Sequence, residues 1–218
     1  MVTHYSRRLA LVLGLPLLAV MLAACGSTPP ATFYVLNSIS TPPAATGANA
    51  DLVIGVGPVK IADYLDRPQM VRRAGENELV IDEYHQWAEP LKESLPRLLA
   101  LNLSTLLQTD QVTVFPWKGY REPSCRVEAV ITRFDTGLSG AVVLEVLWTL
   151  IDNRNPERAR AGRFHNEVSV ASDAEPAVLA GAMNEALSEF SRVVAAAIQE
   201  LAAGPPPVAS PAEAGALY

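Results

Sequence analysis

One cysteine stands where its thiol could be acylated. Leu22-Ala23-Ala24-Cys25 follows a short basic head, Arg7-Arg8, and an apolar run from Leu9 to Leu22. A basic head, an apolar stretch too short to span a bilayer comfortably and small residues before a cysteine are typical of a bacterial lipoprotein signal peptide. We therefore expect cleavage between Ala24 and Cys25, and lipidation of Cys25 with acyl chains such as palmitate. The alternatives are an uncleaved anchor and an ordinary secretory peptide that contains a cysteine.

The other residues that could carry chemistry form no catalytic or metal-binding pattern. Downstream of Cys25 there are two histidines, His85 and His165, and the sequence has no Gly-x-Ser-x-Gly nucleophile motif and no zinc-ligand spacing. We interpret both histidines as solvated strand residues. Cys125 has no disulfide partner once Cys25 is lipidated, and it opens an apolar strand pattern, which favours a buried thiol over a reactive one. The sequence therefore predicts no catalytic residue, no metal and no cofactor.

Two stretches, at residues 64–73 and 87–91, are richer in aromatic and charged side chains than packing alone requires. The side chains of interest are Tyr64, Asp66, Arg67, Arg72, Trp87 and Glu89. Trp and Arg are frequent hot-spot residues at protein interfaces. We call these six residues the candidate patch and predict that it binds a partner. The structural alternative places Trp87 in the core and pairs Arg67 or Arg72 with a nearby carboxylate.

The charge balance narrows the classes of partner. The 194 residues that follow Ala24 carry 15 Lys and Arg against 23 Asp and Glu, a formal charge of −8. A chain of this balance is poorly suited to bind nucleic acid or an anionic membrane surface through broad basic patches. It is long enough to bury a core of its own and is most simply one domain.

The hydrophobic pattern predicts the elements that would position these residues. Apolar and β-branched runs predict strands at 33–37, 52–59, 69–73, 78–84, 112–117, 126–134, 142–151 and 163–170. Stripes at helical spacing predict helices from Pro90 to about 107 and from about 175 to 202. Within 142–151, one face carries Val142, Leu144, Val146, Trp148 and Leu150, and we expect it to meet the helices.

The order of these elements predicts an α+β fold, in which a mostly antiparallel sheet has two long helices packed on one face. We expect residues 1–24 to be the signal peptide. Residues 25–50 would hold the lipidated cysteine, a first strand at 33–39 and a flexible linker. Residues 51–203 would form a single α+β domain whose sheet the first strand joins. Residues 204–218, rich in Pro, Ala and Gly, would be a disordered tail.

Several of these stretches resemble one known family. The lipidation motif is followed by FYVLN, LVIGVGPVKIADYLDRPQMVRR and WAEPL. In this order and spacing they are similar to the PqiC/YmbA family, the auxiliary lipoproteins of ABC-type and MCE-type transport systems. The resemblance covers most of residues 25–200, and its specific parts are YLDRPQMVRR and WAEPL. It leaves out the linker at 40–50 and the tail after residue 203.

The resemblance implies a non-catalytic outer-membrane lipoprotein that faces the periplasm. It would work with an MCE-domain protein anchored in the inner membrane (PqiB-like) and with the membrane subunits of that system, which carries lipid between the membranes and supports outer-membrane integrity. It would be held to the membrane by its acyl chains and could form a homo-oligomer. No catalytic residues are carried over. Gly26, rather than aspartate, follows the cysteine and also favours the outer membrane.

Two alternative functions share the same anchor. The first is a structural envelope lipoprotein that binds the cell wall or another outer-membrane protein and has no transport role. The second is an envelope hydrolase, against which the missing nucleophile motif argues.

Overall fold

Two long helices and eight strands make up the fold in the residues that the structure describes. The computed structural model describes residues 29–40, 52–117, 122–138, 140–171 and 173–203. The strands are β1 (Thr32–Tyr34), β2 (Ile54–Ile61), β3 (Gln69–Gly75), β4 (Glu78–Trp87), β5 (Val112–Val114), β6 (Cys125–Thr136), β7 (Val142–Asp152) and β8 (Arg160–Val168). The helices are α2 (Leu91–Leu107) and α3 (Pro176–Ala203), with single 3₁₀ turns η1 (Asp63–Leu65) and η2 (Pro156–Arg158).

The chain divides into two compact units between Ala31 and Thr32, and all these elements belong to the second. The predicted signal peptide at 1–24, Cys25 and the tail at 204–218 lie outside the described residues, as does nearly all of the linker predicted at 40–50.

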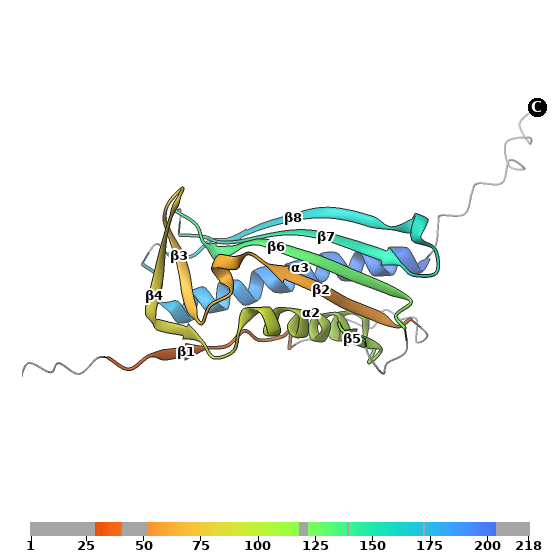
Figure 1. Cartoon of the computed structure of the whole chain (residues 1–218), viewed down its shortest axis with the longest axis horizontal. Coiled ribbons are helices and arrows are strands. Elements are labelled where there is room, and N and C mark those ends of the chain that lie inside the picture. Colours follow the sequence, from red (N-terminus) through yellow and green to blue (C-terminus); the bar gives the residue numbers. More distant parts are fainter. Residues whose placement is uncertain (1–28, 41–51, 118–121, 139, 172, 204–218) are drawn as a thin grey trace, which may run out of the picture. The chain divides into compact units, whose positions relative to one another are not determined.

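Strand β6 is the centre of the sheet. It pairs antiparallel with β7 along its whole length and parallel with β2, and it touches β3 in parallel at Arg72 and Thr136. Beyond these neighbours, β8 pairs antiparallel with β7, β5 lies parallel to β2, β4 forms an antiparallel hairpin with β3, and β1 adds parallel to β4 at the edge (Figure 1). The α+β class is confirmed, and the longest ladders, β6–β7 and β7–β8, are antiparallel.

The parallel pairings are a feature that the sequence analysis did not predict. Between β2 and β6 the chain runs through the β3–β4 hairpin and then through α2. A connection of this length crosses back over the sheet, so that the two strands can run in the same direction.

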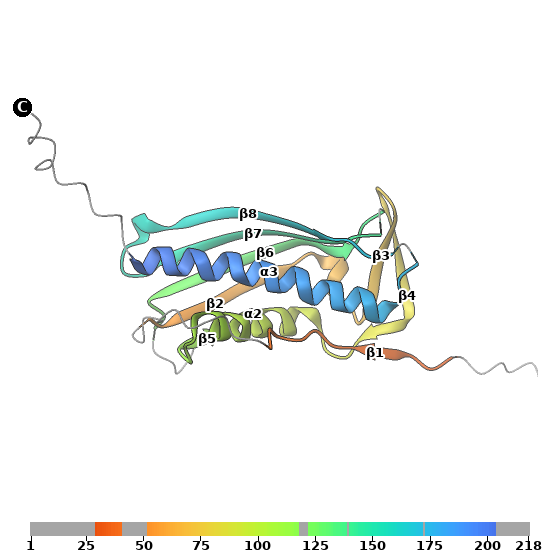
Figure 2. The same ribbon diagram turned by 180° about the vertical axis from the view of Figure 1, so that it is seen from behind.

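Both helices cover the same face of the sheet. Helix α3 packs against β7 and β8, α2 packs against β2 and β5, and the two helices contact one another (Figure 2). Pro90 is the residue directly before α2, and Gln108, directly after its last residue Leu107, caps the helix in a left-handed conformation with a φ of 52°. The apolar stripe predicted for α3 is buried throughout, at Leu179, Met183, Leu187, Phe190, Val194, Ile198 and Leu201.

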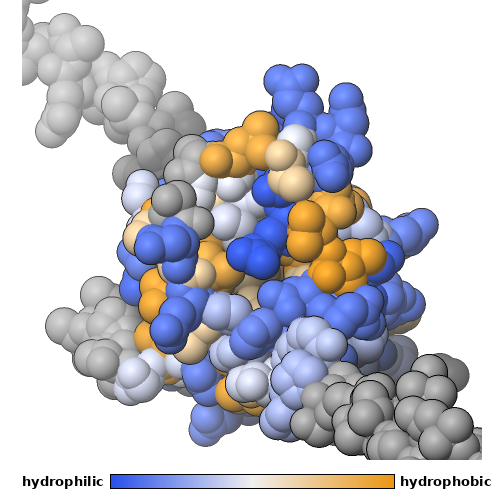
Figure 3. Space-filling view, turned by 90° about the vertical axis from the view of Figure 1, so that its left-hand side faces the viewer, coloured by the Kyte–Doolittle hydropathy of each residue, from blue (hydrophilic) through white to orange (hydrophobic). Residues whose placement is uncertain are grey.

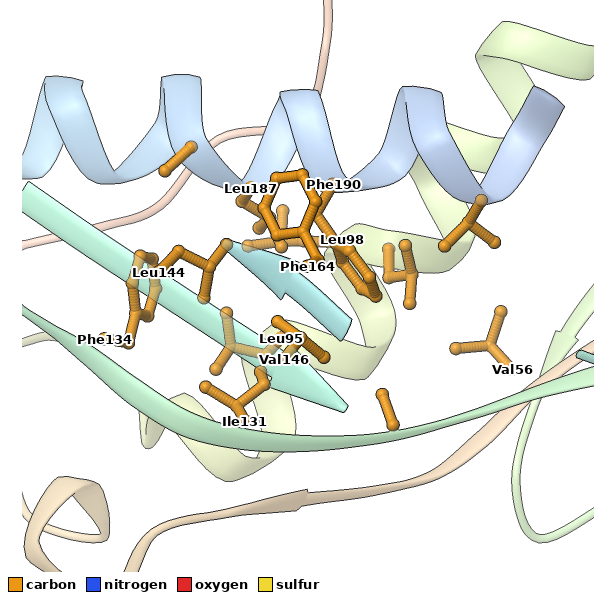
Figure 4. Close-up of a cluster of buried hydrophobic side chains, with 14 of the residues drawn as sticks. Val56, Leu95, Leu98, Ile131, Phe134, Leu144, Val146, Phe164, Leu187 and Phe190 are labelled. Atoms are coloured by element: carbon orange, nitrogen blue, oxygen red, sulfur yellow. The ribbon is translucent and has the colours of Figure 1, made fainter. Parts of the chain in front are cut away.

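The core lies between the two helices and the face of the sheet that they cover, with β7 near its centre. Val142, Leu144, Val146 and Leu150 are each 0 % exposed, as the alternation predicts, and Leu147 on the other face is 42 % exposed. Two residues depart from the alternation: Trp148, predicted on the inner face, is only half-buried, and Val143 on the other face is 2 % exposed. Figure 4 shows Leu144 and Val146 among the aromatic and aliphatic side chains of α3 and β6. In the same ladder Gly162 lies opposite Trp148, and a Cβ on this glycine would come within 3.0 Å of the indole ring. The glycine therefore leaves room for the ring.

A short segment after β1 lies across the two helices, and we call residues 36–39 the strap. Leu36 is buried, and the N–H of Ile39 donates to Asn102 Oδ1 on α2 at 2.8 Å. The N–H of Asn37 donates to Asn184 Oδ1 on α3 at the same distance. Asn102 is 0 % exposed and also donates through Nδ2 to Ser191 Oγ on α3 at 2.9 Å. The strap, α2 and α3 are thus joined by one buried amide.

Candidate partner-binding surface

The two stretches of the candidate patch lie side by side. Trp87 at the end of β4 donates its backbone N–H to the carbonyl of Pro68 at 2.6 Å, which brings the turn before β3 against the entrance of α2. In chain order the six residues lie on η1 (Tyr64), after η1 (Asp66 and Arg67), on β3 (Arg72), on β4 (Trp87) and before α2 (Glu89). The structure thus places them near one end of the helix pair.

Tyr64 points inward, to a buried carboxylate that the sequence analysis did not single out. Its hydroxyl donates to Asp135 Oδ2 at 2.7 Å, and Asp135 is 0 % exposed. Burial, followed by the hydrogen bond to Asp135 and its negative charge, raises the pKa of Tyr64 above its usual range. Two arginines compensate the negative charge of Asp135. Arg133 Nε lies 2.9 Å from Asp135 Oδ1, and Arg73 Nε lies 3.2 Å from the same atom. This cluster fixes η1 and β3 onto β6, which is a structural role.

Asp66 and Glu89 pair with lysine and arginine side chains of α2. Asp66 Oδ2 lies 3.3 Å from Lys92 Nζ, and Glu89 Oε1 lies 2.5 Å from Arg97 Nη2. All four side chains are more than a third exposed. Exposed pairs of this kind contribute up to about 1 kcal/mol, so a charged partner can compete with them.

The two arginines of the candidate patch differ in exposure. The Arg72 side chain is 45 % exposed and lies 3.7 Å from Asp82 on the neighbouring strand. Arg67 is half-buried, and its Nε is buried without a hydrogen-bond partner in the described part of the chain. Arg72 is therefore the arginine that is open to a partner.

Trp87 is 5 % exposed and belongs to the hydrophobic core. It is therefore not available as an exposed aromatic contact, and its position corresponds to the structural alternative considered above. The members of the candidate patch whose side chains remain substantially exposed are Asp66, Arg72 and Glu89. All three carry charge, so the apolar part of any binding surface has to come from other residues.

Exposed apolar residues lie on the adjacent β3–β4 hairpin and in the nearby β6–β7 turn. Leu79, Val80 and Ile81 are consecutive on β4 and are 36, 42 and 39 % exposed, and Leu138 in the β6–β7 turn is 59 % exposed. Figure 3 shows apolar groups bordered by hydrophilic ones on this side of the molecule. We call residues 78–82 the β4 edge. The signal in the sequence was the run Leu-Val-Ile, which breaks the alternation expected of a strand with one buried face.

The two histidines lie apart and have different neighbours. His85 Nδ1 is 2.8 Å from the hydroxyl of Tyr34, across the β1–β4 pair. His165 lies on β8 with Nδ1 3.3 Å from Glu145 and Nε2 3.4 Å from Glu167. Neither arrangement includes a serine, threonine or cysteine nucleophile among these contacts.

Cys125 lines a hollow of about 470 Å³ at the end of the sheet where α3 finishes. The thiol is 1 % exposed, and burial, followed by the charge of Asp152, raises its pKa to about 12. Arg158 lines the same hollow. Its Nη1 lies 3.4 Å from Asp152 Oδ2, and its Nη2 donates to the carbonyl of Leu201 at 2.6 Å. A cation bound to a carbonyl of the last helical turn stabilises the helix C-terminus.

The described residues contain no group of three or more His, Cys, Asp and Glu that could hold a metal ion. In the same part of the chain, neither helix is long and apolar enough to cross a bilayer.

Comparison with known proteins identifies the family. The family model described as the ABC-type transport auxiliary lipoprotein component matches residues 34–195, from β1 to the last turns of α3. The chain belongs to this family. Its match includes both stretches of the candidate patch, and the predicted family resemblance is confirmed.

Among curated members of the auxiliary lipoprotein family, the chain is similar to the intermembrane transport lipoprotein PqiC of Escherichia coli strain K12. The two are 26 % identical over 133 residues, which are 61 % of this chain and 70 % of PqiC. PqiC of Shigella flexneri gives the same figures.

Two crystal structures share the fold of this auxiliary lipoprotein. Protein XCC0632 from Xanthomonas campestris has a TM-score of 0.64 and 17 % identity, and the match covers 80 % of this chain and all of that one. An uncharacterized protein has a TM-score of 0.62 and 22 % identity, with 78 and 99 % of the two chains covered. At these identities the similarity concerns the fold alone.

Proposed function

We propose that this protein is a non-catalytic, periplasm-facing lipoprotein subunit of an MCE/ABC-type intermembrane lipid transport system. In this proposal it supports outer-membrane integrity by binding an MCE-domain protein that is anchored in the inner membrane. The observation that carries the proposal is the family match over residues 34–195, together with the similarity to an intermembrane transport lipoprotein, PqiC.

The proposed anchor is Cys25, processed at the Ala24–Cys25 bond. One acyl chain gives only marginal membrane binding, whereas two or more give stable attachment. A lipoprotein cysteine with several acyl chains would therefore keep the domain permanently at the outer membrane. This part of the proposal predicts that labelled palmitate is incorporated into the wild-type protein and not into Cys25→Ser.

A binding role agrees with the state of the side chains that could otherwise act as catalysts. The Cys125 thiol is buried, and its pKa is raised to about 12. Asp135 is buried and neutralised by Arg73 and Arg133. By contrast, the exposed groups near the hairpin are charged and apolar side chains of the kind found at protein interfaces.

Co-purification tests the proposal. The full-length lipidated protein is isolated from envelopes solubilised in mild detergent, and the proteins recovered with it are identified. We expect an MCE-domain protein and its membrane subunits. Failure to recover any of them after gentle cross-linking, with recovery of peptidoglycan or another outer-membrane protein instead, would replace this proposal with the structural alternative.

A further inference from the structure

The β4 edge has an open side in the described part of the chain. On one side β4 pairs with β3, and on the other side β1 pairs only with His85, Gln86 and Trp87. Residues 78–82 therefore have no neighbouring strand on their outer side among the described residues. The unpaired N–H and C=O groups of such an edge are a template for an added strand.

Strand β1 shows that this side of β4 accepts an extended segment. It lies parallel to β4 over three residue pairs, and its Tyr34 carbonyl accepts the N–H of Ala88 at 2.8 Å. Pro29 and Pro30 come shortly before β1 in the sequence, and proline has no N–H to donate to a ladder. The same strand is therefore poorly suited to extend its pairing along the rest of β4.

The side chains of the β4 edge are unusually apolar for an exposed strand. Natural edge strands are commonly protected by lysine, proline or a bulge, but Leu79, Val80 and Ile81 are consecutive and all more than a third exposed. Successive side chains point to opposite faces of a strand, so both faces of the hairpin are apolar here. Val80 and Leu138, with Arg72 and Arg73 of β3, line a hollow of about 260 Å³ on one face of the hairpin. It can receive a side chain of an added strand.

The charge of the hairpin selects the chemistry of the added strand. From Gln69 to Trp87 the chain carries four carboxylates and two arginines, and Arg73 is held by the buried Asp135. Glu76 and Glu78 have no ion-pair partner within the described residues. Lysine or arginine on the incoming strand would complement them. A second copy of this chain would instead bring its own acidic edge, and an anionic bilayer would bring more negative charge.

We propose that the β4 edge binds an extended segment of another protein by strand addition, and that this segment alternates apolar and basic side chains. The backbone of residues 78–82 supplies the hydrogen bonds, the hollow beside Val80 and Leu138 takes an apolar side chain, and the glutamates take the basic ones. The identity of the partner as a transport subunit rests on the proposed function, whereas the chemistry of the site does not.

The direct test uses a fluorescent synthetic peptide in which valine and lysine alternate, titrated with the full-length protein in detergent and followed by anisotropy. We compare Val80→Lys with Val130→Lys, a matched control. Val130 is 40 % exposed against 42 % for Val80, but it lies on β6, which has strands on both sides. Both variants change the net charge equally, and circular dichroism with thermal unfolding verifies that both are folded.

We expect Val80→Lys to weaken peptide binding about tenfold or more and Val130→Lys to leave it unchanged. A peptide in which glutamate replaces lysine, and one whose backbone amides are methylated, should bind at least about tenfold more weakly than the parent peptide. The proposal is overturned if Val80→Lys and Val130→Lys bind the peptide equally, or if the glutamate peptide binds as well as the lysine peptide. It is also overturned if Val80→Lys alters only self-association, seen by sedimentation, or only attachment to phosphatidylglycerol vesicles.

The same variants separate this inference from the proposed function. If the wild type recovers an MCE-domain protein from envelopes and Val80→Lys does not, the transport assignment and the strand-addition site both stand. If the wild type recovers none but the peptide still discriminates the variants, the transport assignment fails and the strand-addition site stands. If all variants recover the MCE-domain protein and the peptide does not discriminate them, the site fails and the transport assignment stands.

Discussion

Replacing Asn102 with alanine removes the buried amide that joins the strap to both helices. The side chain is 0 % exposed, accepts the N–H of Ile39 at 2.8 Å and donates to Ser191 Oγ at 2.9 Å. Each buried hydrogen bond contributes about 1 kcal/mol net, and a donor left unpaired costs about 1–3 kcal/mol more. Ser191 keeps its own bond to the carbonyl of Leu187, so the N–H of Ile39, whose bond to Asn102 is part-buried, is the group left unpaired. We expect Asn102→Ala to lower the free energy of unfolding by about 3 kcal/mol.

Asn184→Ala is the matched control. Asn184 accepts the N–H of Asn37 at the same distance of 2.8 Å, but this bond is exposed to water. We therefore expect a loss of no more than about 1 kcal/mol. Both substitutions place alanine inside a helix, so the gain of about 0.5 kcal/mol from its better helix propensity cancels in the comparison.

Urea denaturation of the purified chain, followed by tryptophan fluorescence, measures both variants. Hydrogen exchange supplies a second readout, because the amide of Ile39 should exchange much faster in Asn102→Ala while amides of β7 keep their order of protection. A loss below about 1 kcal/mol for Asn102→Ala, or equal losses for the two variants, would refute the reasoning that burial of this amide decides its contribution.

Four further outcomes follow from buried groups and from close packing. The raised pKa of Cys125 keeps the thiol protonated at pH 8, so iodoacetamide should modify it slowly in the folded protein and rapidly in urea. The free energy of unfolding should also fall as the pH rises from about 9 toward 12, because only the unfolded chain then releases the proton, and Cys125→Ala should reduce this slope. Asp135→Asn leaves two arginines without their charge partner and should cost about 3 kcal/mol in urea denaturation, against about 1 kcal/mol for Tyr64→Phe. Gly162→Val should lower the melting temperature by several degrees and shift the fluorescence of Trp148, because its Cβ lies within 3.0 Å of the indole; unchanged emission would contradict that contact.

The periodic parts of the fold could be predicted from the sequence. Alternation between Val142 and Leu150 identified the buried face of β7, and the stripe from Leu179 to Leu201 identified α3, because burial of one face leaves a one-dimensional pattern. The parallel pairing of β2 with β6 could not be predicted in this way. Strand direction depends on how the intervening hairpin and α2 cross the sheet, and periodicity contains no information about that path.

The residues of the surface were harder to predict than those of the core. Tryptophan is a residue type that is common at binding sites, but Trp87 is buried. Burial of its large apolar side chain in the core lowers the free energy of the folded state more than exposure to water would. Asp135 was not predicted as a site residue, because two of its partners, Arg73 and Tyr64, are 62 and 71 positions away in the sequence. The exposure of Leu79, Val80 and Ile81 depends on which strand lies beside β4, which only the folded chain reveals.

Helix α3 has a mechanical consequence for anything that binds this protein. Its 28 residues extend for about 42 Å at 1.5 Å per residue. Leu179 and Met183 at its beginning line the same hollow as Met70 of β3, and Leu201 near its end is held by Arg158. A single stiff rod therefore connects the hairpin end of the sheet to the end that holds η2. We therefore expect a force applied at one end to move the whole domain rather than to bend it, so that the two ends keep a fixed separation.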